Sequence, residues 1–212
     1  MLRAYLKITK ETVDHRIEVV ADQPSRSFLL QFPSLMARQW MQTTDTCKDT
    51  AGQVISTYSA VRLPFHVLGS PGYGRTLHVT SSYFLDMTMD ADGLGMVIGT
   101  DPAAVQPDQY ALISQIRSGE TAGKVMYCGT HLYGLTINAT TDEASFKVVG
   151  IFHNIGGGNV SINEVGIYAN GASPGDPHPN EQKYGISRDV VSTIVLADAE
   201  FLRVEYTIGI AT

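Results

Sequence analysis

The chain has 212 residues, enough to bury a core within one large domain. Its net charge is -6 and its few basic residues are scattered, which argues against direct binding of nucleic acid. Only 17% of the residues are charged, against about 25% in a typical soluble domain. Such a low charge favours strands buried on both faces, or a surface that meets other proteins.

No apolar run reaches the roughly 20 residues that a membrane helix needs. Charge breaks the apolar run at the N-terminus at once, which is not typical of a signal peptide. We therefore expect no membrane partner. We expect a protein that is made in a cytoplasm and stays soluble until it assembles.

The first third of the chain predicts two strands and a helical region. Alternating apolar residues predict a strand over 2–8, and a second strand is expected over 16–20, followed by a turn at 22–25. Residues 27–41 predict a helix that Pro33 ends or kinks. Its aromatic side chains are expected to be buried against the β domain or against another chain; they are Phe28, Phe32 and Trp40.

The middle of the chain predicts strands over 54–63 and 77–89, and a short buried strand within 93–99. Apolar residues at 112, 113 and 116 have helical spacing. Together with Asp108 as a cap and Gly119 beyond the end, they predict a helix over 108–116.

The last third has the clearest periodicity. Alternation over 146–153 and 160–168, on either side of a Gly/Asn-rich turn, predicts a β-hairpin. The three prolines of 170–180 predict a loop outside the sheet. The closing strand should bury one face and expose the other. We expect the buried set to be Leu202, Val204, Tyr206, Ile208 and Ile210, and the opposite set to be Arg203, Glu205 and Thr207.

These elements predict a mainly β fold: a β-sandwich, jelly-roll-like, with short connecting helices. Two regions are expected. Residues 1–53 would form an N-terminal strand/helix attachment region, and residues 54–212 would form the β-sandwich domain.

The sequence offers weak candidates for chemistry, and we assign no catalytic, cofactor-binding or metal-ligating residue. The glycines of 93–99 are spaced one residue too far apart for a dinucleotide-binding turn. Asp90 and Asp92 form only a fragment of a calcium loop; a polar turn is favoured, and a cation there is the best metal hypothesis. Glu164 lies within an apolar strand, so it is either on a wet face or paired.

Cys47 and Cys128 have no metal-ligand spacing. Two thiols that are partly buried are the favoured interpretation. A disulfide between them remains open.

Three parts of the chain resemble structural proteins of tailed-bacteriophage particles. Residues 98–101 (IGTD) and 108–112 (DQYAL) are similar to a family segment in which a VGTG strand end precedes a D-x-x-L helix. Residues 152–156 (FHNIG) and 160–168 (VSINEVGIY) resemble a family hairpin, and the segment beginning at 187 (SRDVVS) resembles its R-D-V segment and closing strand. The turn is longer here, because three glycines stand where the family has Ser-Gly.

The resemblance implies a virion protein without enzymatic activity, assembled in a host bacterial cytoplasm. We expect a capsid decoration (cement) protein, or a neck or tail component, that contacts the major capsid or tail proteins and forms a homo-oligomer such as a trimer. The alternative is a tail-fibre module that binds host glycan, for which Tyr73 and Tyr133, both expected on Gly-flanked loops, are the candidates. A glycan-cleaving enzyme would need two cooperating carboxylates, and no convincing pair is present.

Overall fold

The protein is described by a computed structural model that covers most of the chain. The described residues are 2–25, 28–29, 32–33, 47–55, 60–62, 92–138, 140, 143–172 and 182–211. Strands dominate this part of the chain. Their bounds are β1 Leu2–Glu11, β2 Ile17–Ser25, β3 Cys47–Lys48, β4 Val54–Ile55, β5 Ala60–Arg62, β6 Gly95–Gly99, β7 Met126–Asn138, β8 Glu143–His153, β9 Val160–Ala172, β10 Gln182–Leu196 and β11 Phe201–Ala211.

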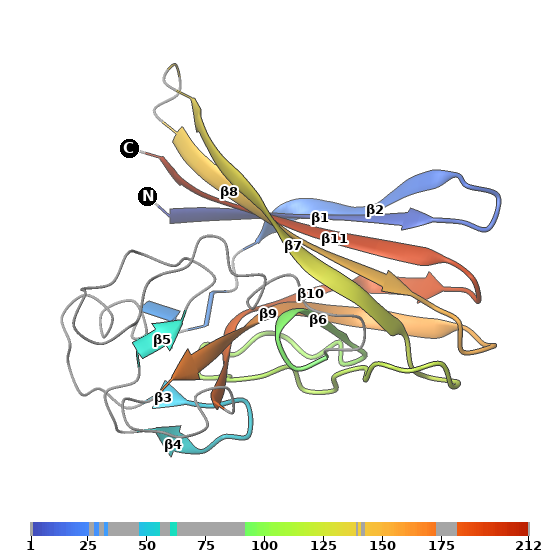
Figure 1. The fold of residues 1–212 in the computed structure, drawn as a ribbon, viewed down its shortest axis with the longest axis horizontal. Helices are drawn as coiled ribbons and strands as arrows, with labels where there is room; N and C mark the ends of the chain where they lie inside the picture. The colour runs from blue at the N-terminus through green and yellow to red at the C-terminus, as the bar shows by residue number, and fades with distance from the viewer. Residues whose placement is uncertain are drawn as a thin grey trace.

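Five strands form an antiparallel sheet in the order β2-β1-β11-β8-β7, with β2 and β7 at its edges (Figure 1). The closing strand β11 lies in its middle, between β1 and β8. Strands β1 and β2 fall within the predicted attachment region 1–53, yet they pair within this same sheet. The boundary expected at residue 53 stays a prediction.

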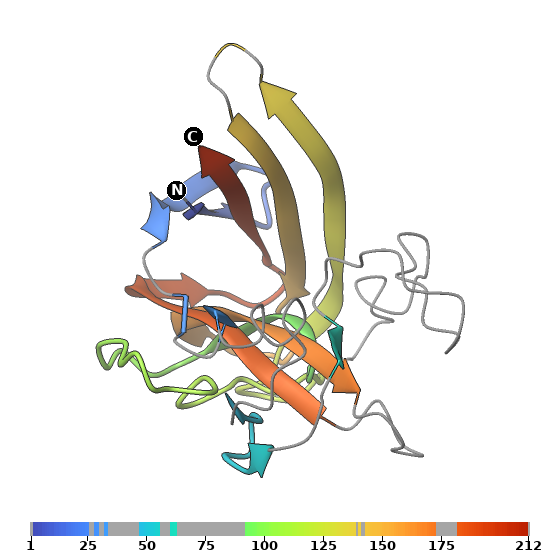
Figure 2. The same ribbon diagram turned by 90° about the vertical axis from the view of Figure 1, so that its left-hand side faces the viewer.

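A second sheet has the order β10-β9-β5, and β6 pairs with β9 on the same side as β5. The two sheets face each other as two layers (Figure 2). This arrangement is a β-sandwich, and the predicted fold class is confirmed. No helix in the described part of the chain has the length and apolar character needed to cross a membrane.

The core lies between the two layers. On β11, Leu202, Val204, Tyr206 and Ile208 are all buried, whereas Arg203 and Thr207 on the other face are partly exposed. The predicted parity of the closing strand is therefore confirmed for these residues. Glu205 shares the outer face but keeps only 7% of its surface exposed, because Lys147 and Arg203 bind its carboxylate. The side chain of Ile210 is outside the described set.

The predicted hairpin over 146–168 is wrong in its pairing, although both strands are present. β8 pairs with β7 and β11 in the first sheet, and β9 pairs with β10 in the second. The turn between them crosses from one layer to the other. Buried Asn154 fixes this turn by donating from its side-chain amide to the carbonyls of Gly158 (2.7 Å) and Leu196 (2.8 Å).

The helix predicted over 108–116 is also wrong, because these residues form no helix. Their backbone amides donate to side chains of β9 in place of helical carbonyls. Leu112 N–H donates to the Tyr168 hydroxyl (2.7 Å), and Ile113 and Ser114 N–H donate to the Glu164 carboxylate (3.2 and 2.8 Å).

Two smaller predictions need correction as well. Residues 22–25 belong to β2 and are not a turn. A proline is tolerated there because β2 is an edge strand, where a missing N–H need not break a ladder. Residues 170–172 belong to β9, so the predicted loop begins later.

Other predictions fall wholly or partly outside the described residues. These are the helix piece over 34–41 with Trp40, the strand over 77–89, and the loop residues 173–180. Phe28 and Phe32 are described: their rings stack at 4.8 Å, and Phe32 is buried in the core. The intramolecular alternative is therefore observed for these two residues.

Candidate functional site

Residues 100–118 follow β6 and lie over the outer face of β9. Met96 on β6 pairs with Ile167 and approaches Gly150 of β8, so both side chains point toward the five-stranded sheet. Alternation then places Gly166 and Tyr168 on the opposite face. Leu112 lies against Gly166 there. We call residues 100–118 the covering segment.

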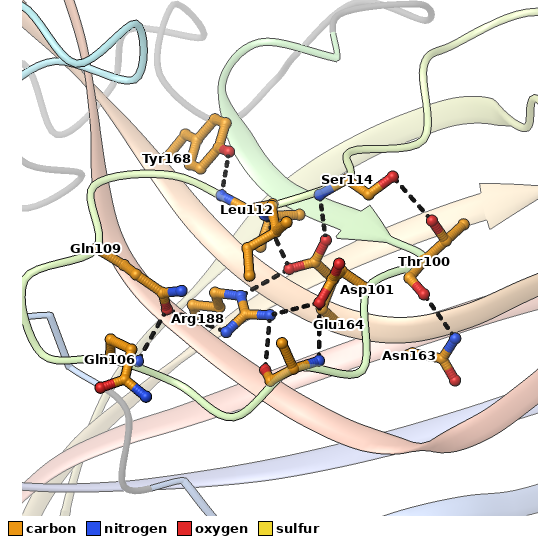
Figure 3. Close-up of polar contacts among 12 residues, drawn as sticks. Thr100, Asp101, Gln106, Gln109, Leu112, Ser114, Asn163, Glu164, Tyr168 and Arg188 are labelled. Atoms are coloured by element: carbon orange, nitrogen blue, oxygen red, sulfur yellow. Dashed lines mark hydrogen bonds and ion pairs between the residues drawn. The ribbon is translucent and has the colours of Figure 1, made fainter.

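A buried ion pair holds the covering segment in place (Figure 3). Glu164 on β9 and Arg188 on β10 both have no exposed side-chain surface. The Arg188 Nε donates to Glu164 Oε2 at 2.7 Å. The same carboxylate accepts the N–H groups of Ile113 and Ser114. An acid in an apolar strand is thus paired, which was one of the two alternatives for Glu164.

The rest of the Arg188 guanidinium also points at the covering segment (Figure 3). One terminal nitrogen donates to Gln109 Oε1 (3.0 Å), and the other donates to the carbonyl of Ala103 (3.0 Å). Asp101 Oδ1 lies 3.8 Å from the second nitrogen. One side chain therefore fixes three separate points of a segment that has no helix.

The chemistry of this cluster is structural. Two charges out of water cost several kcal/mol each unless geometry and further hydrogen bonds compensate, as they do here. The Glu164 carboxylate already accepts three donors, so its oxygens are engaged in holding the chain. Beside it, burial raises the pKa of Tyr168 to about 12, which keeps the hydroxyl neutral as it accepts from Leu112.

A second buried polar cluster joins the two sheets. Asp189 on β10 accepts hydrogen bonds from the hydroxyls of Ser25 on β2 (2.6 Å) and Tyr206 on β11 (2.8 Å). Burial and the adjacent Asp189 carboxylate raise the pKa of Tyr206 well above its ordinary value. The hydroxyl of Tyr206 therefore stays protonated at neutral pH and can donate its hydrogen bond to Asp189 in the opposite sheet.

The hairpin formed by β7 and β8 carries apolar side chains into solvent. Its far end projects beyond the second sheet (Figure 2). Ile137 pairs with Ala144, two residues from Phe146, so it continues the face of the sheet that forms the core. The exposed fractions are large: Leu132 40%, Tyr133 51%, Leu135 65% and Ile137 70%.

The structure places the remaining sequence candidates in different parts of the fold. Asp92 lies in a turn, where it accepts the Ser118 N–H (3.0 Å) and pairs with Arg117 (3.6 Å). This matches the polar turn that the sequence favours at Asp92. The cation hypothesis for Asp90 and Asp92 stays a prediction, because Asp90 lies outside the described residues. Tyr133 lies within β7 and not on a loop, which corrects its placement. Tyr73, Asp90 and the side chain of Cys47 are outside the described set.

Sequence reasoning missed Arg188 and Asp189. Both interrupt an apolar run, and adjacent residues of a strand point to opposite faces. That signal indicates one buried charge on each face of β10. It does not identify Glu164 or Tyr206 as the partners, because the partners follow from the pairing of strands distant in sequence.

Comparison with known proteins does not assign this chain to a family. No family model, no curated protein and no solved structure matches this chain.

Proposed function

We propose that this chain is a structural protein of a tailed-bacteriophage particle, and that it works by contact with other proteins and not by catalysis. Capsid decoration, or a related role in the neck or tail, is the setting that the motif resemblance implies. The observation that carries the contact role is the apolar surface on the core-side face of the β7–β8 hairpin, formed by Leu132, Leu135 and Ile137. Grouped exposed apolar side chains are a feature of protein contact sites.

The positions of the buried charged residues in the described part of the chain support the same role. Glu164, Arg188 and Asp189 are buried and bind neighbouring parts of the chain. They hold the covering segment and the two layers together. The fold is thereby stiffened, while the hairpin surface is left apolar for a neighbour to cover.

The test is whether the chain is a component of purified particles. Particles from a host that produces this protein are banded by density and probed with an antibody to it, and the label is located by electron microscopy. The proposal predicts that the chain bands with the particles and that the label lies on the head, neck or tail. Label confined to the tail tip would support the glycan-binding alternative, and absence from the particles would contradict a virion role.

A further inference from the structure

We propose that two copies of this chain pack face to face through the outer face of the five-stranded sheet, about a two-fold axis that crosses β2, β1, β11 and β8. The contact lies at the end of the sheet that carries the β1–β2 turn, away from the far end of the β7–β8 hairpin (Figure 1). It is a second surface, so the inference goes beyond the proposed function. A two-fold pair is a dimer, in place of the trimer expected with the sequence resemblance.

The register of the strands defines this surface, which we call the outer patch. Alternate residues of β11 point into the core, so Phe201 and Arg203 point outward. Residues that pair directly lie on the same face of a sheet. Two rows of outward-facing residues therefore cross the four strands. The first row is Ile17, Glu11, Phe201 and His153. The second row is Val19, Thr9, Arg203 and Ile151.

The pattern of β2 is the reverse of what a solvated sheet face shows. Ile17 and Val19 face outward and keep 73% and 56% of their surface exposed. Glu18 between them lies on the inner side, where it pairs with Lys10 (3.8 Å), which also pairs with buried Glu200 (3.4 Å). A strand with one solvated face normally turns its polar residues to the water. Apolar side chains outside and charges inside indicate that another molecule covers the outer patch.

Phe201 continues the apolar surface across the sheet. It is 37% exposed, and its ring stacks on that of His153 with 3.8 Å between the ring centroids. The two charged side chains of the patch have partners within the chain. Arg203 binds Glu205 (2.7 Å), and Glu11 lies 2.9 Å from the His15 ring nitrogen. A molecule that covers the patch therefore need not supply a charge for either of them.

A second copy is the occupant that the two rows favour. An axis that runs across the strands, midway between the rows, places each residue opposite the other-row residue of the same strand in the second copy. Ile17 then faces Val19 of the second copy, which is an apolar contact. Phe201 faces Arg203 of the second copy, and a guanidinium against an aromatic ring is a favourable cation–π contact. The strands of the two sheets stay nearly aligned, as is common when sheets pack face to face.

The charges of the patch also suit a second copy. Within the two rows no like charges face each other, because Glu11 faces Thr9 of the second copy and Arg203 faces Phe201. Each Glu11 lies one strand away from Arg203 of the second copy, so the nearest charge across the contact is of opposite sign. One kind of contact thus covers the outer patch in both copies and leaves the β7–β8 hairpin available for other proteins.

The experiment measures self-association of the full chain by sedimentation velocity, from about 1 to 100 µM. The Lys variant carries Ile17→Lys with Val19→Lys, and the Glu variant carries Ile17→Glu with Val19→Glu. The matched control places Lys at Leu135 and Ile137, which are exposed apolar residues (65% and 70%) of the β7–β8 hairpin. Thermal melting checks that each variant is folded, and Ser at the same two positions replaces a charged variant that is not.

We expect the wild type and the hairpin control to dimerise. We expect the Lys and Glu variants each to self-associate at least about tenfold more weakly, because residue 17 of one copy faces residue 19 of the other and like charges then meet. Mixing these two variants should restore a 1:1 dimer, because opposite charges then meet at the same places.

A monomeric wild type at the highest concentration overturns the inference, and so does an undiminished dimer in both charged variants. Loss of the dimer in the hairpin control alone overturns it as well and assigns self-association to the hairpin. Restoration on mixing excludes misfolding as the cause of the loss, whereas no restoration between two folded variants overturns the two-fold arrangement. If the wild type is monomeric but still bands with particles, the contact function stands and only the self-pairing fails.

Discussion

Arg188 is the residue with the most demanding environment in the described part of the chain. Its side chain is fully buried, and its guanidinium binds Glu164, Gln109 and Ala103. Because the partners come from β9 and from the covering segment, this one residue links a sheet to a segment that has no regular structure. Its removal would leave the Glu164 charge buried with only two backbone amides.

We expect Arg188→Met to lower the free energy of unfolding by about 3–5 kcal/mol, the cost of an unpaired buried charge. Urea titration at neutral pH measures this loss. The double variant Glu164→Gln with Arg188→Met should lose less than Arg188→Met alone, because no charge is then left without a partner. A loss below about 1 kcal/mol in the single variant would contradict this role for the pair.

Glu205 gives a pH-dependent prediction. Burial alone would raise the pKa of its carboxyl, but hydrogen bonds from Lys147 and Arg203 outweigh burial and lower the pKa from its ordinary 4.5. A group whose folded pKa is lowered contributes stability above its unfolded pKa, and this contribution is lost as the pH falls through the folded pKa.

At pH 7 we therefore expect Glu205→Gln to be less stable than the wild type by about 0.5–1 kcal/mol, a modest value because both partners are partly exposed. The difference should shrink as the pH falls below 4.5. Urea titrations across this range measure it. Glu143→Gln is the control at pH 7: its ion pair with Arg3 spans 4.0 Å between two exposed side chains, so its removal should cost less than that of Glu205.

At the scale of elements, alternation predicted the strands now seen as β1, β8, β9 and β11, and a short apolar run between glycines predicted β6. It did not predict which strands pair, because a period of two specifies a buried face and not a partner. The helix predicted over 108–116 failed for a related reason. Its apolar spacing is helical, but Tyr168 and Glu164 accept the amides that a helix would use, and both lie about fifty residues away in the sequence.

The closing strand β11 tests the parity argument. Ile208 is 3% exposed and pairs with Ala4 and Phe146 in the core face. Aspartate at this position would be buried without a partner, at a cost of several kcal/mol against a total reserve of about 5–15 kcal/mol. We expect Ile208→Asp to abolish soluble, folded protein.

Thr207→Asp is the neighbouring control. Thr207 lies on the outer face and pairs with Lys147, whose ammonium favours a nearby carboxylate. This variant should fold and melt close to the wild type. Equal behaviour of the two variants in expression and thermal melting would mean that both faces of β11 are buried, and the one-face interpretation would fall.

At the scale of the whole molecule, buried polar contacts hold the two layers together, and the two edges of the five-stranded sheet differ in charge. One edge of the five-stranded sheet carries Glu18, Asp22 and Pro24, whereas the other is the uncharged strand β7. The sequence shows the low charge of the chain, but only the sheet order shows that β7 is the last of the described strands in its sheet. The candidate contact surface therefore followed from topology and not from any motif.

Hydrogen exchange of the free protein and of the same protein in purified particles tests the central claim most directly. If a neighbouring protein covers the β7–β8 hairpin, the amides of Met126–Asn138 become more protected in the particle. Those of Ile17–Ser25 on β2 do not change. Equal exchange of the β7 amides in both samples would contradict the hairpin as the surface through which this protein contacts other proteins.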